Sequence, residues 1–136
     1  MTVEYPKPLP QLTDDNGPYL EGLRERELRL QRCGACGRYR YPPARFCPHC
    51  LSEEASWEVA SGRGTLYSFI VVHQLYHPGF RDDIPYNVAI VELDEGPRIT
   101  SNVVGCENRD LKIGMRLVAE YFDATPEATI LKFRPA

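Results

Sequence analysis

Four of the five cysteines lie within residues 32–50, in the stretch RCGACGRYRYPPARFCPHC. They form two Cys-x-x-Cys pairs, Cys33 with Cys36 and Cys47 with Cys50, separated by ten residues. A two-residue spacer lets the chain turn tightly with both sulfurs facing inward, so two such pairs can converge on one tetrahedral ion. The spacing therefore predicts a closed four-thiolate metal site.

Other chemistry is less consistent with these cysteines. A redox dithiol usually occurs once, beside a βαβ unit, whereas this chain has two pairs and no such pattern. Iron on four thiolates uses the same protein ligands, so the sequence favours zinc but leaves iron open. Because a closed four-thiolate site leaves the ion no position for water, the predicted role of the metal is structural.

The other reactive side chains have ordinary structural interpretations. His49, inside a Cys-x-x-Cys turn, is expected to be a surface residue. Cys106 is expected to be a small buried residue, because a thiol nucleophile needs a base that the sequence does not show. His73 and His77 flank a strand end, where their spacing does not bring two imidazoles together. Turn carboxylates are expected at Asp82, Asp83, Asp94 and Glu95. We therefore predict no catalytic residue.

Composition points to a compact folded domain. Of 136 residues, 43% are hydrophobic and 26% charged, so a packed core is feasible. The start MTVEYPKPLPQL lacks the apolar segment of a signal peptide or membrane anchor, which predicts a cytoplasmic protein without structural disulfides. A net charge of −3, with no long run of Lys or Arg, argues against a nucleic-acid footprint.

Local patterns predict a helix, then strands. In DDNGPYLEGLRERE (14–27), Pro18 suits the first turn of a short helix and the preceding Asp and Asn residues can cap it. Leucines alternate with polar residues in ELRLQRC (27–33), which is typical of a strand, with a continued helix as the alternative. β-branched and aromatic residues predict five more strands, at 64–74, 85–93, 98–104, 115–122 and 128–133.

Five antiparallel strands, with the longer connection after the third, favour the small Greek-key barrel called an OB-fold. A generic small β-barrel or sandwich is the alternative. The chain is thus expected to be mainly β. Its predicted parts are an N-terminal extension with a helix at 1–32, a zinc ribbon at 33–56 and an OB-fold at 57–136.

The order of these motifs resembles a known family. A short helix, then LQRCGACGRYRYPPARFCPHC, SGRGTLYSF, PYNVAIVELDEGPRI and LKIGM, is similar to the zinc-ribbon/OB-fold proteins associated with acyl-CoA enzymes. The resemblance covers nearly the whole chain. It implies a rubredoxin-like zinc ribbon before a five-stranded OB-fold barrel. It also implies that the four clustered cysteines, Cys33, Cys36, Cys47 and Cys50, are the zinc ligands.

The family resemblance also implies a function. Such proteins are small partner subunits of thiolase-superfamily enzymes, namely thiolases, acyltransferases and thiolase-like aldolases, in some systems beside a hot-dog-fold hydratase. The large subunit carries the nucleophile and base, while the small one bridges subunits and helps shape the acyl-CoA site. The expected setting is lipid or steroid side-chain degradation. The acyl group, the direction of the partner's reaction and the stoichiometry stay open.

Two sets of side chains are candidates for CoA or protein contacts. CoA phosphates usually recruit arginine or lysine, and the candidates are Arg38, Arg40, Arg45 and Arg63. Aromatic residues are enriched at interfaces, and the ribbon offers Tyr39, Tyr41 and Phe46. The alternative is that the arginines are ordinary surface residues and that the aromatic rings cover the small core of the ribbon.

The predicted function is a non-catalytic accessory subunit that contacts a thiolase-like or aldolase subunit and acyl-CoA, but neither nucleic acid nor a membrane. A single-stranded nucleic-acid binder is the alternative, because zinc ribbons and OB-folds both occur in such proteins. Aromatic residues for base stacking are present at Tyr67, Phe69, Tyr76, Phe80 and Tyr86. The acidic net charge opposes this alternative.

Overall fold

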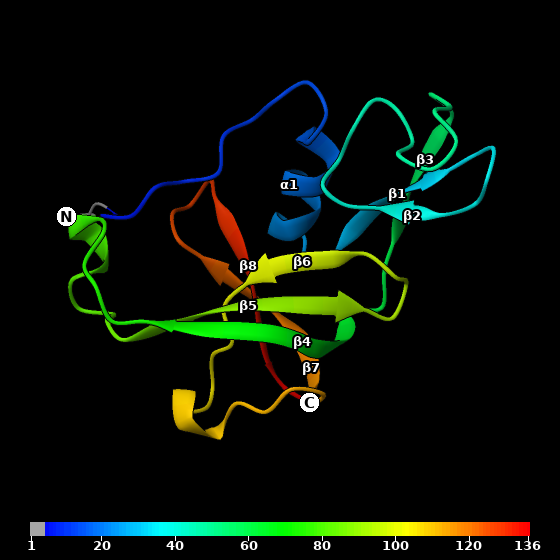
Figure 1. The fold of residues 1–136 in the computed structure, drawn as a ribbon. Coiled ribbons are helices and arrows are strands. Elements are labelled where there is room, and N and C mark those ends of the chain that lie inside the picture. Colours follow the sequence, from blue (N-terminus) through cyan, green and yellow to red (C-terminus); the bar gives the residue numbers. More distant parts are fainter. Residues whose placement is uncertain (1–4) are drawn as a thin grey trace.

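The computed structural model describes residues 5–136, so the first four positions of the predicted 1–32 extension lie outside the described residues. Within this range, an α-helix precedes a three-stranded and a five-stranded antiparallel sheet (Figure 1). The elements are α1 (Gly17–Arg24), β1 (Arg29–Cys33), β2 (Tyr39–Arg40), β3 (Ala55–Val59), β4 (Arg63–Val72), the 3-10 turn η1 (Pro78–Phe80), β5 (Tyr86–Leu93), β6 (Arg98–Ser101), the 3-10 turn η2 (Asn108–Asp110), β7 (Arg116–Asp123) and β8 (Thr129–Pro135).

The predicted helix is present but shorter than 14–27. Pro18 lies in the first turn of α1, as its fixed φ favours. Asn16 occupies the N-cap position, but its side chain accepts a hydrogen bond of 2.8 Å from the Thr13 amide instead of one from the helix. Tyr19 and Leu23 are buried on one face. The chain leaves the helix through Arg26, whose φ is 63°.

The ribbon sheet has the strand order β2-β1-β3. The strand predicted at 27–33 is its central strand, β1, so the alternative of a continued helix is wrong. The sequence did not predict β2 or β3. In the register, Gln31 lies opposite Arg40 on one side and Trp57 on the other. The ribbon sheet therefore extends beyond the expected 33–56, since β1 begins before it and β3 ends after it.

All five strands predicted after Trp57 are present, as β4 to β8. In the strand order β6-β5-β4-β7-β8, the two edge strands are β6 and β8. The chain at the end of β6 pairs with β8. Val103, just after β6, forms a parallel bridge with Phe133 on β8. The Phe133 amide donates to the Asn102 carbonyl at 3.0 Å, and the Val104 amide donates to the Phe133 carbonyl at 2.7 Å. The sheet therefore closes into a barrel, which confirms the OB-fold.

One hydrophobic core joins the helix, the ribbon sheet and the barrel. Tyr19 and Leu23 of α1 and Leu30 of β1 belong to the same buried cluster as Leu66 and Phe133 of the barrel. The Ala60 amide also donates to the Leu28 carbonyl at 2.7 Å, next to the junction of β3 and β4. Because this core is shared, the ribbon is held against the barrel by buried apolar contacts. No helix within the described part of the chain is long and apolar enough to cross a membrane.

Candidate functional site

The four predicted metal ligands converge at one end of the ribbon sheet. All four Sγ atoms lie within 4.8 Å of one another. The Sγ–Sγ distance is 3.5 Å between Cys33 and Cys50 and 3.7 Å between Cys36 and Cys47. A tetrahedron with metal–sulfur bonds of about 2.3 Å places its sulfurs about 3.8 Å apart. All four cysteines are free thiols, and the cluster has the dimensions of a four-thiolate metal site.

Backbone amides of the two turns point at the sulfurs. The amides of Ala35 and Cys36 donate to Cys33 Sγ, both at 3.4 Å, and the His49 amide donates to Cys47 Sγ at 3.4 Å. The hydrogen bond from the Cys36 amide is the largest influence that lowers the pKa of Cys33 to about 6. Because a thiolate is the form that binds metal, these amides prepare the site for an ion.

The two turns repeat one backbone conformation. The Gly37 amide donates to the Cys33 carbonyl at 3.0 Å, and the Leu51 amide donates to the Cys47 carbonyl at 2.9 Å. The φ angle is 78° at Gly37 and 65° at Leu51. The first turn thus uses glycine in the left-handed region, whereas the second uses a leucine there, a feature that the sequence pattern did not predict.

Four of the seven CoA or interface candidates point outward. Arg38, Arg45, Phe46 and Arg63 are exposed. Arg38 Nη1 lies 2.9 Å from His49 Nδ1, which links the two cysteine turns. His49 is exposed, as expected for a surface residue. Arg45 Nε donates to Glu53 at 2.7 Å, and its guanidinium lies 5.4 Å from the centroid of the Phe46 ring.

Arg40, by contrast, points into the ribbon and is only 5% exposed. Its Nε donates to Gln31 Oε1 at 2.9 Å, and its Nη2 donates to the Ala44 carbonyl at 2.9 Å. The expectation of a surface arginine is wrong at this position, because β2 pairs with β1 and turns the side chain inward. Arg40 organises the ribbon between the cysteine pairs and is not accessible to a CoA phosphate.

Two of the aromatic candidates cover the core. The hydroxyl of Tyr39 donates to Glu58 at 2.8 Å, across the ribbon sheet. Tyr41 packs against Tyr19 of α1, with ring centroids 5.5 Å apart. Both rings are half-buried against the shared core, which matches the alternative interpretation that they complete the packing of the ribbon.

The remaining titratable candidates do not assemble into a catalytic group. Cys106 is partly buried, and burial raises the pKa of its thiol, so it is a poor nucleophile. His77 Nδ1 accepts a hydrogen bond of 2.9 Å from the Gly79 amide and thereby caps the turn η1. Within residues 5–136, the group of His, Cys, Asp and Glu side chains with metal-site dimensions is the four-cysteine cluster.

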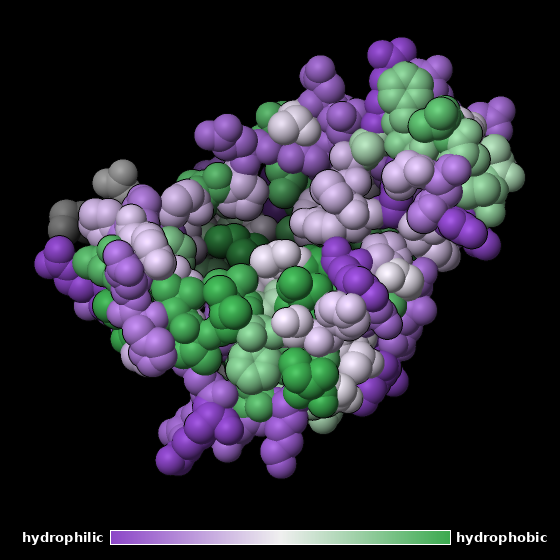
Figure 2. Space-filling view, viewed as in Figure 1, coloured by the Kyte–Doolittle hydropathy of each residue, from purple (hydrophilic) through white to green (hydrophobic). Residues whose placement is uncertain are grey.

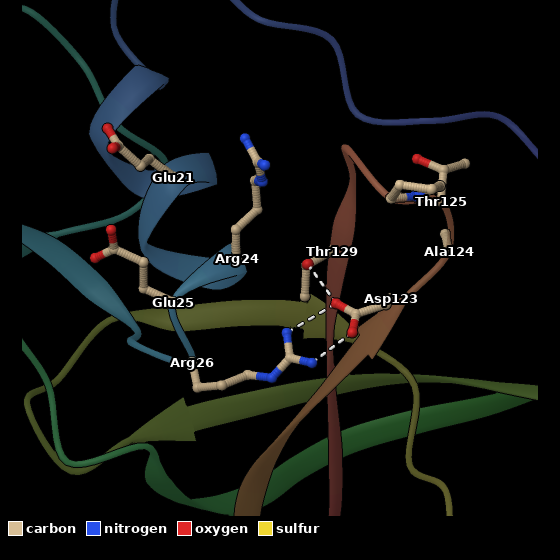
Figure 3. A pocket seen from close by; sticks show the side chains of 9 residues that line it. Glu21, Arg24, Glu25, Arg26, Asp123, Ala124, Thr125 and Thr129 are labelled. Atoms are coloured by element: carbon tan, nitrogen blue, oxygen red, sulfur yellow. Dashed lines mark hydrogen bonds and ion pairs between the residues drawn. The ribbon is translucent and has the colours of Figure 1, made fainter.

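A cleft of about 690 Å³ lies between α1 and the β7–β8 hairpin, at a place that the sequence did not single out (Figure 3). Arg26 forms a bidentate ion pair with Asp123, with N–O distances of 2.8 and 2.5 Å. The Thr129 hydroxyl donates to the same carboxylate at 2.7 Å. These contacts lower the pKa of Asp123 to about 2, with the Arg26 hydrogen bond as the largest cause. The carboxylate is thus engaged in a structural link and is a poor general base.

Comparison with known proteins places this architecture in a family. Residues 20–55 match the family described as "ChsH2, rubredoxin-like zinc ribbon domain", and residues 57–122 match "ChsH2, C-terminal OB-fold domain". A solved structure described as "Ltp2-ChsH2(DUF35) aldolase" superposes with a TM-score of 0.84 at 43% identity, covering 93% of this chain and 98% of that chain. The chain belongs to the ChsH2 (DUF35) family.

Curated relatives of this ChsH2-family chain are named as hydratase subunits or scaffolds. It is 43% identical to the "probable enoyl-CoA hydratase alpha subunit" of Thermomonospora curvata, over 96% of this chain and 40% of the relative. It is 34% identical to the "3-oxo-4,17-pregnadiene-20-carboxyl-CoA hydratase alpha subunit" of Mycobacterium tuberculosis, over 93% of this chain and 39% of the relative. The chain therefore spans about two fifths of the length of these two proteins.

Two further proteins described as DUF35 agree with the assignment. The "DUF35 domain-containing scaffold protein" of Methanocaldococcus jannaschii is 38% identical over 66% of this chain and 64% of the relative. A solved DUF35 structure from Sulfolobus solfataricus superposes with a TM-score of 0.60 at 15% identity, covering 88% of this chain and 83% of that chain. At this low identity, that likeness concerns the fold alone.

Proposed function

We propose that this chain is a non-catalytic accessory subunit that binds a thiolase-superfamily enzyme and helps to assemble or shape its acyl-CoA site. The observation that carries the proposal is the likeness to "Ltp2-ChsH2(DUF35) aldolase", which extends over 98% of that chain at 43% identity. The relatives named as scaffold proteins support a role in assembly. The expected setting is the breakdown of lipid or steroid side chains as CoA thioesters.

The side chains of the described residues support a non-catalytic role. The thiols of the ribbon face one another, and the thiol of Cys106 has a raised pKa. The carboxylate of Asp123 is held by Arg26 and Thr129. The nucleophile and base of the reaction are therefore assigned to the partner.

The proposed ligand of the ribbon is one structural zinc ion on Cys33, Cys36, Cys47 and Cys50. The sulfur–sulfur distances and the match to a rubredoxin-like zinc ribbon support this choice. Zinc bound by four thiolates cross-links the chain and has no position left for a catalytic water.

The relatives named as hydratase alpha subunits support an acyl-CoA setting and a second candidate partner. A hydratase with the hot-dog fold is proposed beside the thiolase-like enzyme, in keeping with those names. The outward side chains Arg38, Arg45, Phe46 and Arg63 are the proposed contacts to CoA or to a partner. Arg40 is removed from this set by its burial.

Co-expression with a thiolase-superfamily enzyme of the same organism tests the proposal. We expect the two proteins to co-purify, and the enzyme to be poorly soluble or inactive without this chain. The purified chain alone should turn over no acyl-CoA substrate. Turnover by the chain alone would overturn the accessory role. Full activity of the co-expressed thiolase-superfamily enzyme without any binding of this chain would overturn it too.

A further inference from the structure

The outer face of β4 and β5 is apolar, and within residues 5–136 most of its side chains are partly or fully exposed. Along β5, Asn87, Ala89, Val91 and Leu93 are buried, so the residues between them point to the opposite face of the sheet. On β4, Ile70 lies opposite Val88, Val72 opposite Tyr86 and Ser68 opposite Ile90. Cross-strand partners share a face, so these side chains form one surface. The β4–β5 face is defined by Tyr67, Ile70, Val72, Val88 and Ile90. At one end of it, the ring of Tyr86 stacks on Phe80 of η1, with ring centroids 5.0 Å apart.

The packing of α1 leaves this face open. The helix lies against β1, β7 and β8. Tyr67 is 47% exposed and Ile70 is 61% exposed. The connection that follows β4 carries two more exposed apolar side chains, Leu75, 37% exposed, and Tyr76, 74% exposed. Figure 2 shows apolar side chains gathered where Figure 1 draws β4 and β5.

The charged side chains beside the β4–β5 face neutralise one another. Arg98 stacks over Tyr67, with its guanidinium carbon 3.8 Å from the ring centroid, and its Nε lies 3.1 Å from Glu92 Oε2. Arg116 forms a bidentate pair with Asp94 at 2.9 and 2.8 Å. Each of these two ion pairs is neutral, and the exposed Arg63 lies at the same end of the sheet. A face of this kind is complementary to an apolar protein surface and not to a polyphosphate backbone.

The exposed area suits the centre of a specific interface. At the exposures given above, Tyr67, Ile70, Leu75 and Tyr76 present on the order of 400 Å² of surface. This is comparable to the largest apolar patch of a typical monomer, which often has a function. A standard interface needs about 800 Å² from each partner, with an apolar centre and a polar rim. The face supplies such a centre, and the two ion pairs supply part of the rim.

We infer that the β4–β5 face is the surface on which the thiolase-superfamily subunit docks. The inference rests on the proposed function and adds the place of contact. The apolar side chains, Tyr67 among them, would lie at the centre of the interface, and Arg98, stacked on Tyr67, would lie at its edge. The exposed aromatic rings of such a centre are typical positions of high binding energy.

The test compares two charge substitutions at sites of equal exposure. Ile70→Glu places a carboxylate in the β4–β5 face. Val59→Glu is the matched control, because Val59 is also β-branched and 61% exposed but lies on β3 of the ribbon sheet. Each full-length variant is titrated against the thiolase-superfamily enzyme that the wild-type chain binds, and the dissociation constant is measured. Thermal unfolding and metal content confirm that both variants are folded.

We expect Ile70→Glu to raise the dissociation constant roughly 100-fold, because burying an unpaired charge in an apolar interface is costly. Tyr67→Ala should raise it roughly 10-fold or more. Val59→Glu should change it less than about 3-fold. A fourth substitution, Phe46→Glu, probes the exposed ring of the ribbon in the same assay.

Unchanged binding by a folded Ile70→Glu variant would overturn the docking surface but leave the accessory function intact. An equal loss in Ile70→Glu and Val59→Glu, or a loss in Phe46→Glu alone, would also overturn it. Self-association of the wild-type chain through this face, abolished by Ile70→Glu, would identify a second copy as the occupant and contradict the inference. If the wild-type chain binds no thiolase-superfamily enzyme, the proposed function fails as well.

Discussion

At the scale of single residues, identical side chains acquire different chemistry from their backbone surroundings. Cys33 and Cys47 are 2% and 1% exposed and receive amide hydrogen bonds at their sulfurs. Cys106 lies near Asp110, and burial together with this carboxylate raises the pKa of its thiol. The amides favour a thiolate at Cys33 and Cys47, whereas the surroundings of Cys106 favour a neutral thiol.

A matched pair of cysteine substitutions tests this difference. In Cys33→Ser we expect most of the bound zinc to be lost, because one of four thiolates is removed from a site worth on the order of 10–16 kcal/mol in zinc-finger peptides. In Cys106→Ser the zinc content should stay at one ion per chain. Elemental analysis of the purified proteins measures both. Wild-type protein that is fully folded without metal would contradict the prediction.

Leu51 offers a test of backbone conformation. Its φ of 65° lies in the left-handed region, and its side chain is 75% exposed, so a glycine loses little packing there. A left-handed residue other than glycine costs about 1–2 kcal/mol, while glycine costs about 0.5–1 kcal/mol in unfolded-state entropy. We therefore expect Leu51→Gly to raise the free energy of unfolding by up to about 1 kcal/mol.

The reciprocal change serves as the control for Leu51. Gly37 has the equivalent conformation in the first turn, with a φ of 78°, and space for a Cβ atom around it. Gly37→Leu should therefore lower the free energy of unfolding by about 1 kcal/mol through backbone strain alone. Urea denaturation of the metal-loaded Leu51→Gly and Gly37→Leu variants measures both free energies of unfolding. A destabilised Leu51→Gly variant would show that the left-handed turn is not strained.

At the scale of elements, the ribbon sheet depends on its cross-links more than the barrel does. Its flanking strand β2 has two residues, whereas the barrel strands β4, β5 and β7 have eight or more. The exposed strand β3 buries little of its length. Apolar burial therefore stabilises the barrel, and we expect the ribbon to require the proposed metal in addition.

Removal of metal should unfold the ribbon before the barrel. Trp57, the single tryptophan of the chain, lies on β3 and is half-buried against the core, so its fluorescence reports the ribbon sheet. We expect a strong chelator to shift Trp57 emission to longer wavelength while amide hydrogens of β4 and β5 remain protected from exchange. Simultaneous loss of protection in the ribbon and the barrel would contradict this order.

The link between Arg26 and Asp123 connects the end of α1 to β7 and predicts a pH dependence. Ion pairing holds the pKa of Asp123 at about 2, below the value of about 3.9 expected in an unfolded chain. A depressed folded-state pKa stabilises the protein above the unfolded value, and this stabilisation is lost as the pH falls through the folded value. The loss should therefore occur between about pH 4 and pH 2.

The variant Asp123→Asn lacks this titration. Its urea midpoint should fall less steeply than that of the wild type between about pH 4 and pH 2. Asp14→Asn is the control, since Asp14 lies in the exposed segment before α1. The same acid dependence in Asp123→Asn and in the wild type would show that the Arg26–Asp123 pair does not contribute.

At the scale of the whole molecule, the charge distribution separates the two functions considered from the sequence. The net charge is −3, and the ion pairs beside the β4–β5 face cancel. Binding of a single strand requires a positively charged groove with aromatic platforms, and its affinity comes mainly from phosphate neutralisation. We expect no measurable binding of a single-stranded oligonucleotide at physiological salt. Submicromolar, salt-sensitive affinity in a fluorescence anisotropy titration would favour the nucleic-acid alternative.

The sequence by itself determined the features that depend on local spacing. The Cys-x-x-Cys pairs, the helix beginning near Pro18 and the five barrel strands were predicted because their patterns repeat over a few residues. The family and its OB-fold could be recognised for the same reason, from the order of short motifs. The four proposed metal ligands were therefore named without knowledge of the tertiary structure.

Only the tertiary structure decided the features that depend on pairing between distant segments. Arg40 became an interior residue because β2 pairs with β1, and β3 joined the ribbon sheet although it is far from β1 in sequence. The β4–β5 face exists because the register places Ile70 opposite Val88, on the side that α1 does not cover. Burial is set by which surfaces meet in space, and short sequence patterns do not specify those long-range contacts.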